Sequence, residues 1–164
     1  MRMRYTLALA AASMLIFGTT GVALANTGFS ANLNGLNEVP ANASPATGYG
    51  FCVLDNAGAN LSYSVTYSGL VAPRTASHFH GPATTAQNAA VVFAIAGAGP
   101  TADVITGSWA IDATNLTRLQ SGLLYFNVHS TTFGGGEIRG QILPDATPTR
   151  GTTWGRIKAM YAGK

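Results

Sequence analysis

Short alternations of apolar and polar residues run through most of the chain. In the clearest of them, residues 61–68, serines and threonines alternate with the apolar side chains Leu61, Tyr63, Val65 and Tyr67. Successive side chains of a strand point to opposite faces, so this segment is predicted to be a strand with one buried face. The preceding segment 48–54 leads into it through the turn-rich residues 55–59, and the two segments are predicted to form a hairpin.

Four further segments carry strand patterns, and one carries a helix pattern. Strands are predicted at 91–96, 104–111, 123–129 and 137–143. The continuous apolar run at 91–96 is expected to be a central strand buried on both faces. A short helix is predicted between Asp112, whose side chain can cap it, and Gly122, which can end it. Many short strands with abundant glycine favour an antiparallel all-β sandwich or barrel of about seven or eight strands.

Residues 1–25 have the pattern of a signal peptide. A basic start at Arg2 and Arg4 is followed by an apolar run to Val22 and a small-residue cleavage sequence that ends at Ala25. The apolar run is too short for a stable membrane anchor, so an uncleaved anchor is the less favoured alternative. The protein is therefore predicted to be secreted or periplasmic, without a membrane anchor after cleavage.

The remaining chain is predicted to hold one β-domain at 26–143, followed by a Pro/Thr/Gly-rich linker and basic tail at 144–164. Nine Lys and Arg stand against six Asp and Glu, and cleavage removes Arg2 and Arg4, which leaves a nearly neutral protein. Nucleic-acid binding needs a concentrated basic surface, and the body of the chain has none. The only cysteine, Cys52, cannot form an internal disulfide and is predicted to be buried in an apolar strand.

The candidate chemistry lies in the three histidines. His78 and His80 flank Phe79, and His129 lies in a second predicted strand. In an extended strand, His78 and His80 share one face while Phe79 points to the other, where it is expected to join the core. Three imidazoles are a suitable ligand set for copper or zinc. The sequence does not say which strands are neighbours, so the meeting of the three histidines is a hypothesis.

Alternation also predicts a polar face around His129. If the segments 123–129 and 137–143 pair as a hairpin, their apolar sets should share the core face. Five polar side chains would then line the opposite surface: Asn127, His129, Glu137, Arg139 and Gln141. Glu137 is a candidate fourth ligand, and Asn127, Glu137 and Gln141 are candidates to orient the imidazoles. The competing interpretation is that the histidines, Glu137 and Arg139 form a structural hydrogen-bond network.

Several motifs resemble the CHRD domain, which was first described in chordin and occurs in many bacterial exported proteins. They are Leu36-Asn37-Glu38-Val39-Pro40, His78-Phe79-His80-Gly81-Pro82-Ala83, Asn127-Val128-His129-Ser130 and Gly135-Gly136-Glu137-Ile138-Arg139-Gly140-Gln141-Ile142. The resemblance spans about residues 29–143. It implies an extracytoplasmic, all-β fold, either an immunoglobulin-like sandwich or a Greek-key barrel. It implies little about activity. Chordin itself binds growth factors, which suggests a binding module but does not transfer to a single bacterial domain.

Three classes of function follow. The first is an exported β-domain that binds one copper or zinc ion through His78, His80 and His129. The second is a cell-surface or extracellular module that binds a protein partner, in which the polar cluster only holds the scaffold. An enzyme is the least favoured class, because the chain offers no Ser-His-Asp order, no paired carboxylates and no phosphate-binding glycine motif.

Overall fold

The fold is all-β with one short helix. The structure is a computed structural model and describes residues 27–145. A single 3-10 turn, η1 (Gly35–Asn37), follows the first strand. The other elements are β1 (Thr27–Asn34), β2 (Thr47–Leu54), β3 (Asn60–Ser68), β4 (Arg74–His80), β5 (Val91–Ala96), β6 (Asp103–Ala110), α1 (Ala113–Gln120), β7 (Tyr125–Ser130), β8 (Ile138–Gln141) and β9 (Leu143–Pro144).

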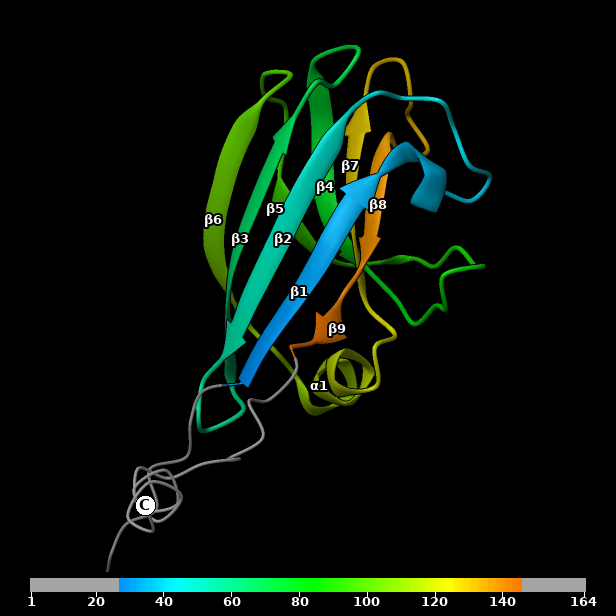
Figure 1. The fold of residues 1–164 in the computed structure, drawn as a ribbon. Helices are drawn as coiled ribbons and strands as arrows, with labels where there is room; N and C mark the ends of the chain where they lie inside the picture. Colours follow the sequence, from blue (N-terminus) through cyan, green and yellow to red (C-terminus); the bar gives the residue numbers. More distant parts are fainter. Residues whose placement is uncertain (1–26, 146–164) are drawn as a thin grey trace, which may run out of the picture.

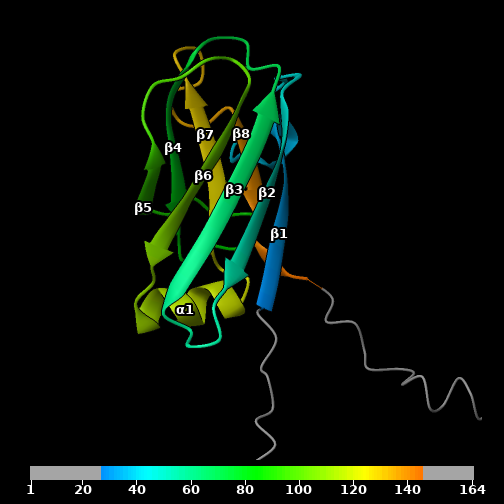
Figure 2. The ribbon, with the colours of Figure 1, turned by 90° about the vertical axis from the view of Figure 1, so that its left-hand side faces the viewer.

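The strands form one antiparallel sheet that nearly closes into a barrel. Its order is β5-β4-β7-β8-β1-β2-β3-β6, and β9 pairs with β1. Figures 1 and 2 show the sheet folded into two layers, with β1, β2, β3 and β6 facing β4, β5, β7 and β8. The end strands β5 and β6 contact each other, which brings the two edges together. The predicted all-β class is confirmed, and the β2–β3 and β7–β8 hairpins are both present.

The strand β5 corrects one sequence-based prediction. It lies at one end of the sheet order, and none of its residues is fully buried. Val91, for example, is 48% exposed. Its apolar run therefore marks an edge strand, not a central one. Periodicity could not separate these cases, because a continuous apolar run carries no alternation that would tell a strand buried on both faces from one that is partly exposed. In β5, Val92, Phe93, Ile95 and Ala96 pack partly buried against the core.

The core lies between the two layers and is centred on Phe79. The Phe79 ring is fully buried and packs on Phe126 of β7 at 4.6 Å and on Trp109 of β6 at 5.3 Å between ring centroids. Tyr63 of β3 meets it edge-on at 5.4 Å. The predicted core position of Phe79 is confirmed. Cys52 is also fully buried, as predicted, and burial raises the pKa of its thiol to about 12.

The helix α1 closes the end of the barrel beneath β9 and begins as the sequence predicts (Figure 1). The Asp112 side chain accepts a hydrogen bond from the backbone N–H of Asn115, which caps the first turn. Leu119 is fully buried beneath the sheet, and Gly122 follows the helix with a φ of 66°. This is the left-handed conformation in which glycine is favoured at a helix end.

Two predicted segments fall mainly outside the described residues. The signal peptide at 1–25 lies wholly outside them. Two residues of the predicted linker and tail are described: Pro144 of β9 pairs with Phe29 of β1, and Asp145 accepts a hydrogen bond from Ser30. The rest of the linker and tail lies outside the described residues. None of the helices within 27–145 has the length and apolar character needed to span a bilayer.

The packing of β2 on β7 leaves no space for a side chain at Gly50. A Cβ atom there would overlap the ring of Phe126. We expect Gly50→Ala to lower the free energy of unfolding by about 1 to 3 kcal/mol, because the core must shift to admit a methyl group. Urea unfolding measures this. Gly97→Ala, where a Cβ would meet nothing within 4 Å, is the control and should change stability far less. Equal effects would contradict the packing described.

Candidate functional site

The three histidines meet on one face of the sheet. In the β4–β7 pairing, His78 is opposite Asn127 and His80 is opposite Tyr125. His129 is opposite Ala76, two residues before His78 and on the same face of β4. All three imidazoles therefore point to the side away from Phe79. One ligand nitrogen from each lies within 4.8 Å of the others. The Nδ1 of His78 and the Nε2 of His129 are 3.1 Å apart. The clustering that the sequence left as a hypothesis is present in the structure.

Backbone carbonyls fix the orientation of two of the rings. The Nδ1 of His80 donates to the carbonyl oxygen of Ala89 at 3.0 Å, and the Nδ1 of His129 donates to that of Gly134 at 3.1 Å. Because a carbonyl can only accept, each ring carries its proton on Nδ1. The Nε2 lone pairs of both rings are thus free to act as acceptors or ligands. The Nε2 of His80 is buried and has no hydrogen-bond partner.

Burial keeps these imidazoles neutral. His80 is 7% exposed and His129 is 8% exposed, whereas His78 is half-buried. Burial lowers the pKa of His80 to about 4, and the Ala89 hydrogen bond only partly opposes this. Burial also lowers the pKa of His78 and of His129. At neutral pH the site therefore presents three uncharged nitrogen ligands, which is the protonation state that metal binding requires.

Tyr125 lies between His80 and Arg139. The His80 ring stacks on the Tyr125 ring with 5.0 Å between centroids and 9° between planes. The guanidinium carbon of Arg139 lies 3.6 Å from the centroid of the same ring. Because β7 runs between β4 and β8, the phenol ring is held between the imidazole and the guanidinium. The Tyr125 hydroxyl accepts a hydrogen bond from Ala89 N, so it also fixes the peptide that orients His80.

Arg139 holds the loop 81–90 over this face. Its guanidinium donates to the carbonyl oxygens of Thr84 and Gln87, each at 2.9 Å, and to the side chain of Asn88. Arg139 is only 1% exposed. The face that carries Asn127, His129 and Arg139 is polar, as predicted, but it is not a surface, because loops cover it. Alternation cannot reveal this, since it distinguishes the two faces of a strand and not what covers them.

The predicted orienting residues hydrogen-bond to groups other than the imidazoles. Glu137 accepts hydrogen bonds from Ser44 Oγ at 2.7 Å and from Val71 N at 2.8 Å, and it is not part of the histidine group. Gln141 donates to the carbonyl oxygens of Ala83 and Gly122. Asn127 donates to Glu38. The predicted roles of Glu137 as a fourth ligand or orienting group, and of Asn127 and Gln141 as orienting groups, have no hydrogen bond to an imidazole behind them; the carbonyls of Ala89 and Gly134 orient two of the rings instead.

Glu38 is a buried carboxyl that the sequence analysis did not single out. It follows η1, is 7% exposed, and accepts from Asn127 Nδ2 at 3.4 Å. Burial raises the pKa of Glu38 to about 7, although the charge of Arg139 and the Asn127 hydrogen bond act to lower it. Its position in the first quoted motif was the signal available. Buried glutamate is rare without a partner, so its presence there asks for an explanation.

A proton on Glu38 accounts for two unpaired oxygens. Glu38 Oε1 and Asn127 Oδ1 are both buried without a partner. Both lie 2.6 Å from the position that a Cβ of Gly136 would occupy, so they flank the same glycine. Gly136 also has a φ of 139°, which strongly favours glycine. A protonated Glu38 can donate to Asn127 Oδ1 while it accepts from Asn127 Nδ2, which pairs the acid with the amide.

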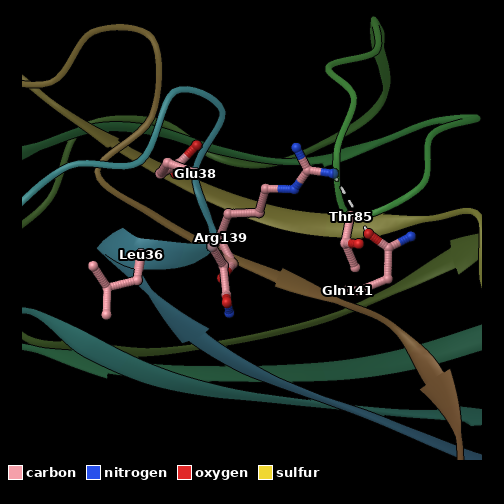
Figure 3. A pocket seen from close by; sticks show the side chains of 6 residues that line it. Leu36, Glu38, Thr85, Arg139 and Gln141 are labelled. Atoms are coloured by element: carbon pink, nitrogen blue, oxygen red, sulfur yellow. Dashed lines mark hydrogen bonds between the residues drawn. The ribbon is translucent and has the colours of Figure 1, made fainter.

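A pocket of about 240 Å³ lies beside Arg139 and Glu38. Figure 3 shows Arg139 extending from β8 toward the loop that carries Thr85, with Gln141 beside its guanidinium. Leu36 stands at this pocket and is 78% exposed. The pocket does not include the histidines, and the nitrogens of Arg139 that reach the loop are engaged by protein oxygens. The histidine group is therefore the stronger candidate site.

The comparisons with known proteins identify the domain. The sequence model of the CHRD domain matches residues 29–142. The chain belongs to the CHRD domain family. No curated protein and no solved structure matches the chain significantly. In this CHRD domain, the segments first noted as motifs converge around the histidine face: η1 and Glu38, the end of β4, β7, and β8. The family resemblance seen in the sequence is thus confirmed, and the structure shows why these distant segments go together.

The Glu38–Asn127 pair predicts a specific pH dependence of stability. The ordinary pKa of a glutamate, which Glu38 has in the unfolded chain, is 4.5, and burial raises the pKa of Glu38 in the folded protein to about 7. Between these values the unfolded chain loses the proton first, so Glu38 lowers stability as the pH rises. Relative to Glu38→Gln, the wild type should lose about 2 to 3 kcal/mol of unfolding free energy between about pH 5 and about pH 8. Glutamine keeps the pairing with Asn127 and has no proton to lose.

Urea unfolding of both proteins at the two pH values measures this difference. The titration of the histidines is common to both proteins and cancels in the comparison. Unfolding free energies that run parallel with pH would show that Glu38 is not the protonated partner of Asn127.

Proposed function

We propose that this CHRD domain binds one copper or zinc ion through His78, His80 and His129. The observation that carries the proposal is the Nε2 of His80. It is a buried, uncharged nitrogen without a hydrogen-bond partner. It belongs to a ring that has one nitrogen within 4.8 Å of a nitrogen of each of the other two histidines. A buried polar atom left unpaired costs free energy, and a shared metal ion would remove that cost.

The spacing supports one shared ion. Ligand nitrogens about 2 Å from a metal stand roughly 3 to 4 Å from one another. His78 Nδ1 and His129 Nε2 already have this spacing at 3.1 Å, and all three ligand atoms fall within 4.8 Å. The half-buried His78 can turn to close the remaining distance, while carbonyls hold the other two rings. An ion would replace the hydrogen bond between His78 and His129.

The proposed site keeps one position open. Among the described residues, no carboxylate or thiolate joins the three histidines. Three protein ligands with a fourth position for water or another ligand are typical of sites that exchange or use their metal, whereas structural zinc sites are closed by four. We therefore favour a metal-binding role in an exported protein, with residues 1–25 as the signal peptide.

The protein-binding alternative is supported by a different observation. Glu137 and Arg139 are engaged with loop atoms, as expected of a structural network. This assignment applies to those two residues and leaves the nitrogen of His80 unexplained. If the domain proves to bind no metal, we would assign it the binding of a protein partner.

Metal stoichiometry after dialysis tests the proposal. Mature protein loaded with Cu²⁺ or Zn²⁺ should retain one equivalent of metal. His78→Ala should weaken affinity by at least about 100-fold, because it removes one ligand from the set. His78 is the least buried of the three, so this variant is the one best placed to fold normally. Metal at 100 times its dissociation constant should also stabilise the wild type by about 2.7 kcal/mol.

The control is Asn60→Ala, an exposed change at the start of β3. It should leave both stoichiometry and affinity unchanged. Sub-stoichiometric retention of zinc and of copper in both oxidation states by the wild type, or equal retention by His78→Ala, would remove the metal hypothesis and leave the structural interpretation of the cluster.

A further inference from the structure

We infer that the three-histidine site selects a monovalent ion, Cu⁺, over divalent Zn²⁺. This inference rests on the proposed function, since it concerns the same site. It goes further by naming the charge of the ion that the surroundings favour.

The ligands and their hydrogen-bond partners are all uncharged. His80 and His129 donate to backbone carbonyls, not to carboxylates. Histidines that bind zinc often donate to a carboxylate, which makes the ring more basic and offsets the positive charge. Glu137, the carboxylate expected to serve here, bonds elsewhere. No Asp, Glu or Cys within 27–145 belongs to the ligand group. The full charge of the ion would therefore remain uncompensated by the protein.

A fixed positive charge lies on the far side of the ring that His80 stacks on. Arg139 lies 3.6 Å from the centroid of Tyr125, and His80 stacks on that ring at 5.0 Å. The guanidinium is thus about 9 Å or less from the His80 imidazole, close enough to repel a cation bound there through the protein interior.

Burial amplifies the difference between one and two charges. The free-energy cost of moving an ion out of water grows with the square of its charge, so a divalent ion pays about four times as much as a monovalent ion of the same size. Two of the three histidines are almost fully buried. Imidazole suits copper and zinc alike, so charge and burial, and not the type of ligand, decide between the two ions here. The combination favours Cu⁺, and a divalent ion would need an added anion in the open position.

Asn88 allows the charge of Arg139 to be offset without removing a buried side chain. It is exposed, and its Oδ1 accepts from Arg139 Nη1 at 3.3 Å. Asn88→Asp places a carboxylate on the guanidinium from outside. Asn56→Asp, an equally exposed change in the β2–β3 turn, is the matched control for added negative charge. Measurements at about pH 6 keep Glu38, the carboxyl beside Arg139, mostly protonated and therefore uncharged.

The experiment measures affinities of the mature protein for Zn²⁺, for Ag⁺ as a redox-inert monovalent probe, and for Cu⁺ under anaerobic conditions with a chromogenic competitor. We expect the wild type to bind both monovalent ions more tightly than Zn²⁺. Asn88→Asp should raise the affinity for Zn²⁺ several-fold more than the affinity for Ag⁺, since the second charge feels the same potential again. Asn56→Asp should change that ratio little.

The outcomes separate the two levels of the proposal. Tighter binding of Zn²⁺ than of Ag⁺ and Cu⁺ by the wild type would overturn the inference and leave the metal site standing. A Zn²⁺-to-Ag⁺ ratio that responds equally to Asn88→Asp and Asn56→Asp would also overturn it. Absence of binding by all three ions would remove the proposed function itself.

Discussion

The in-register pairing of β4 with β7 is the constraint on which the rest of the site depends. One register places Phe79 opposite Phe126 on the core side and His80 opposite Tyr125 on the other. A shift of β4 by one residue would send His78 and His80 into the core and Phe79 out of it. The large aromatic core that Phe79 anchors therefore also fixes the positions of the imidazoles. Packing energy on one face of the sheet holds the polar arrangement on the other.

The second requirement is a cover for that polar face. Arg139 draws the loop 81–90 across it by donating to carbonyl oxygens, and the same loop supplies the Ala89 carbonyl that orients His80. The Gly134 carbonyl does the same for His129 from the β7–β8 loop. The histidines are thus removed from water by the loops that orient them. This explains how a domain with few charged residues holds three uncharged nitrogens together.

The sequence predicted the strands well where alternation was clear, as in the β2–β3 hairpin. The helix that Asp112 caps was predicted as well. It also predicted that His78, His80 and His129 share one side, because period-two geometry decides this within each strand. It misplaced β5 and the orienting role of Glu137, because both depend on which segments become neighbours. The backbone carbonyls of Ala89 and Gly134 have no signature in a sequence. Glu38 lay in a quoted motif, but its burial becomes visible only in the fold.

The proposed function requires above all that three imidazoles share one metal ion. X-ray absorption spectroscopy of the metal-loaded mature protein, at the copper or zinc edge, examines the ligands of the bound ion directly. The account predicts three nitrogen neighbours at about 2 Å, with the outer-shell scattering of imidazole rings. A first shell made only of oxygen, or of sulfur from Cys52, or a shell with a single imidazole would contradict it.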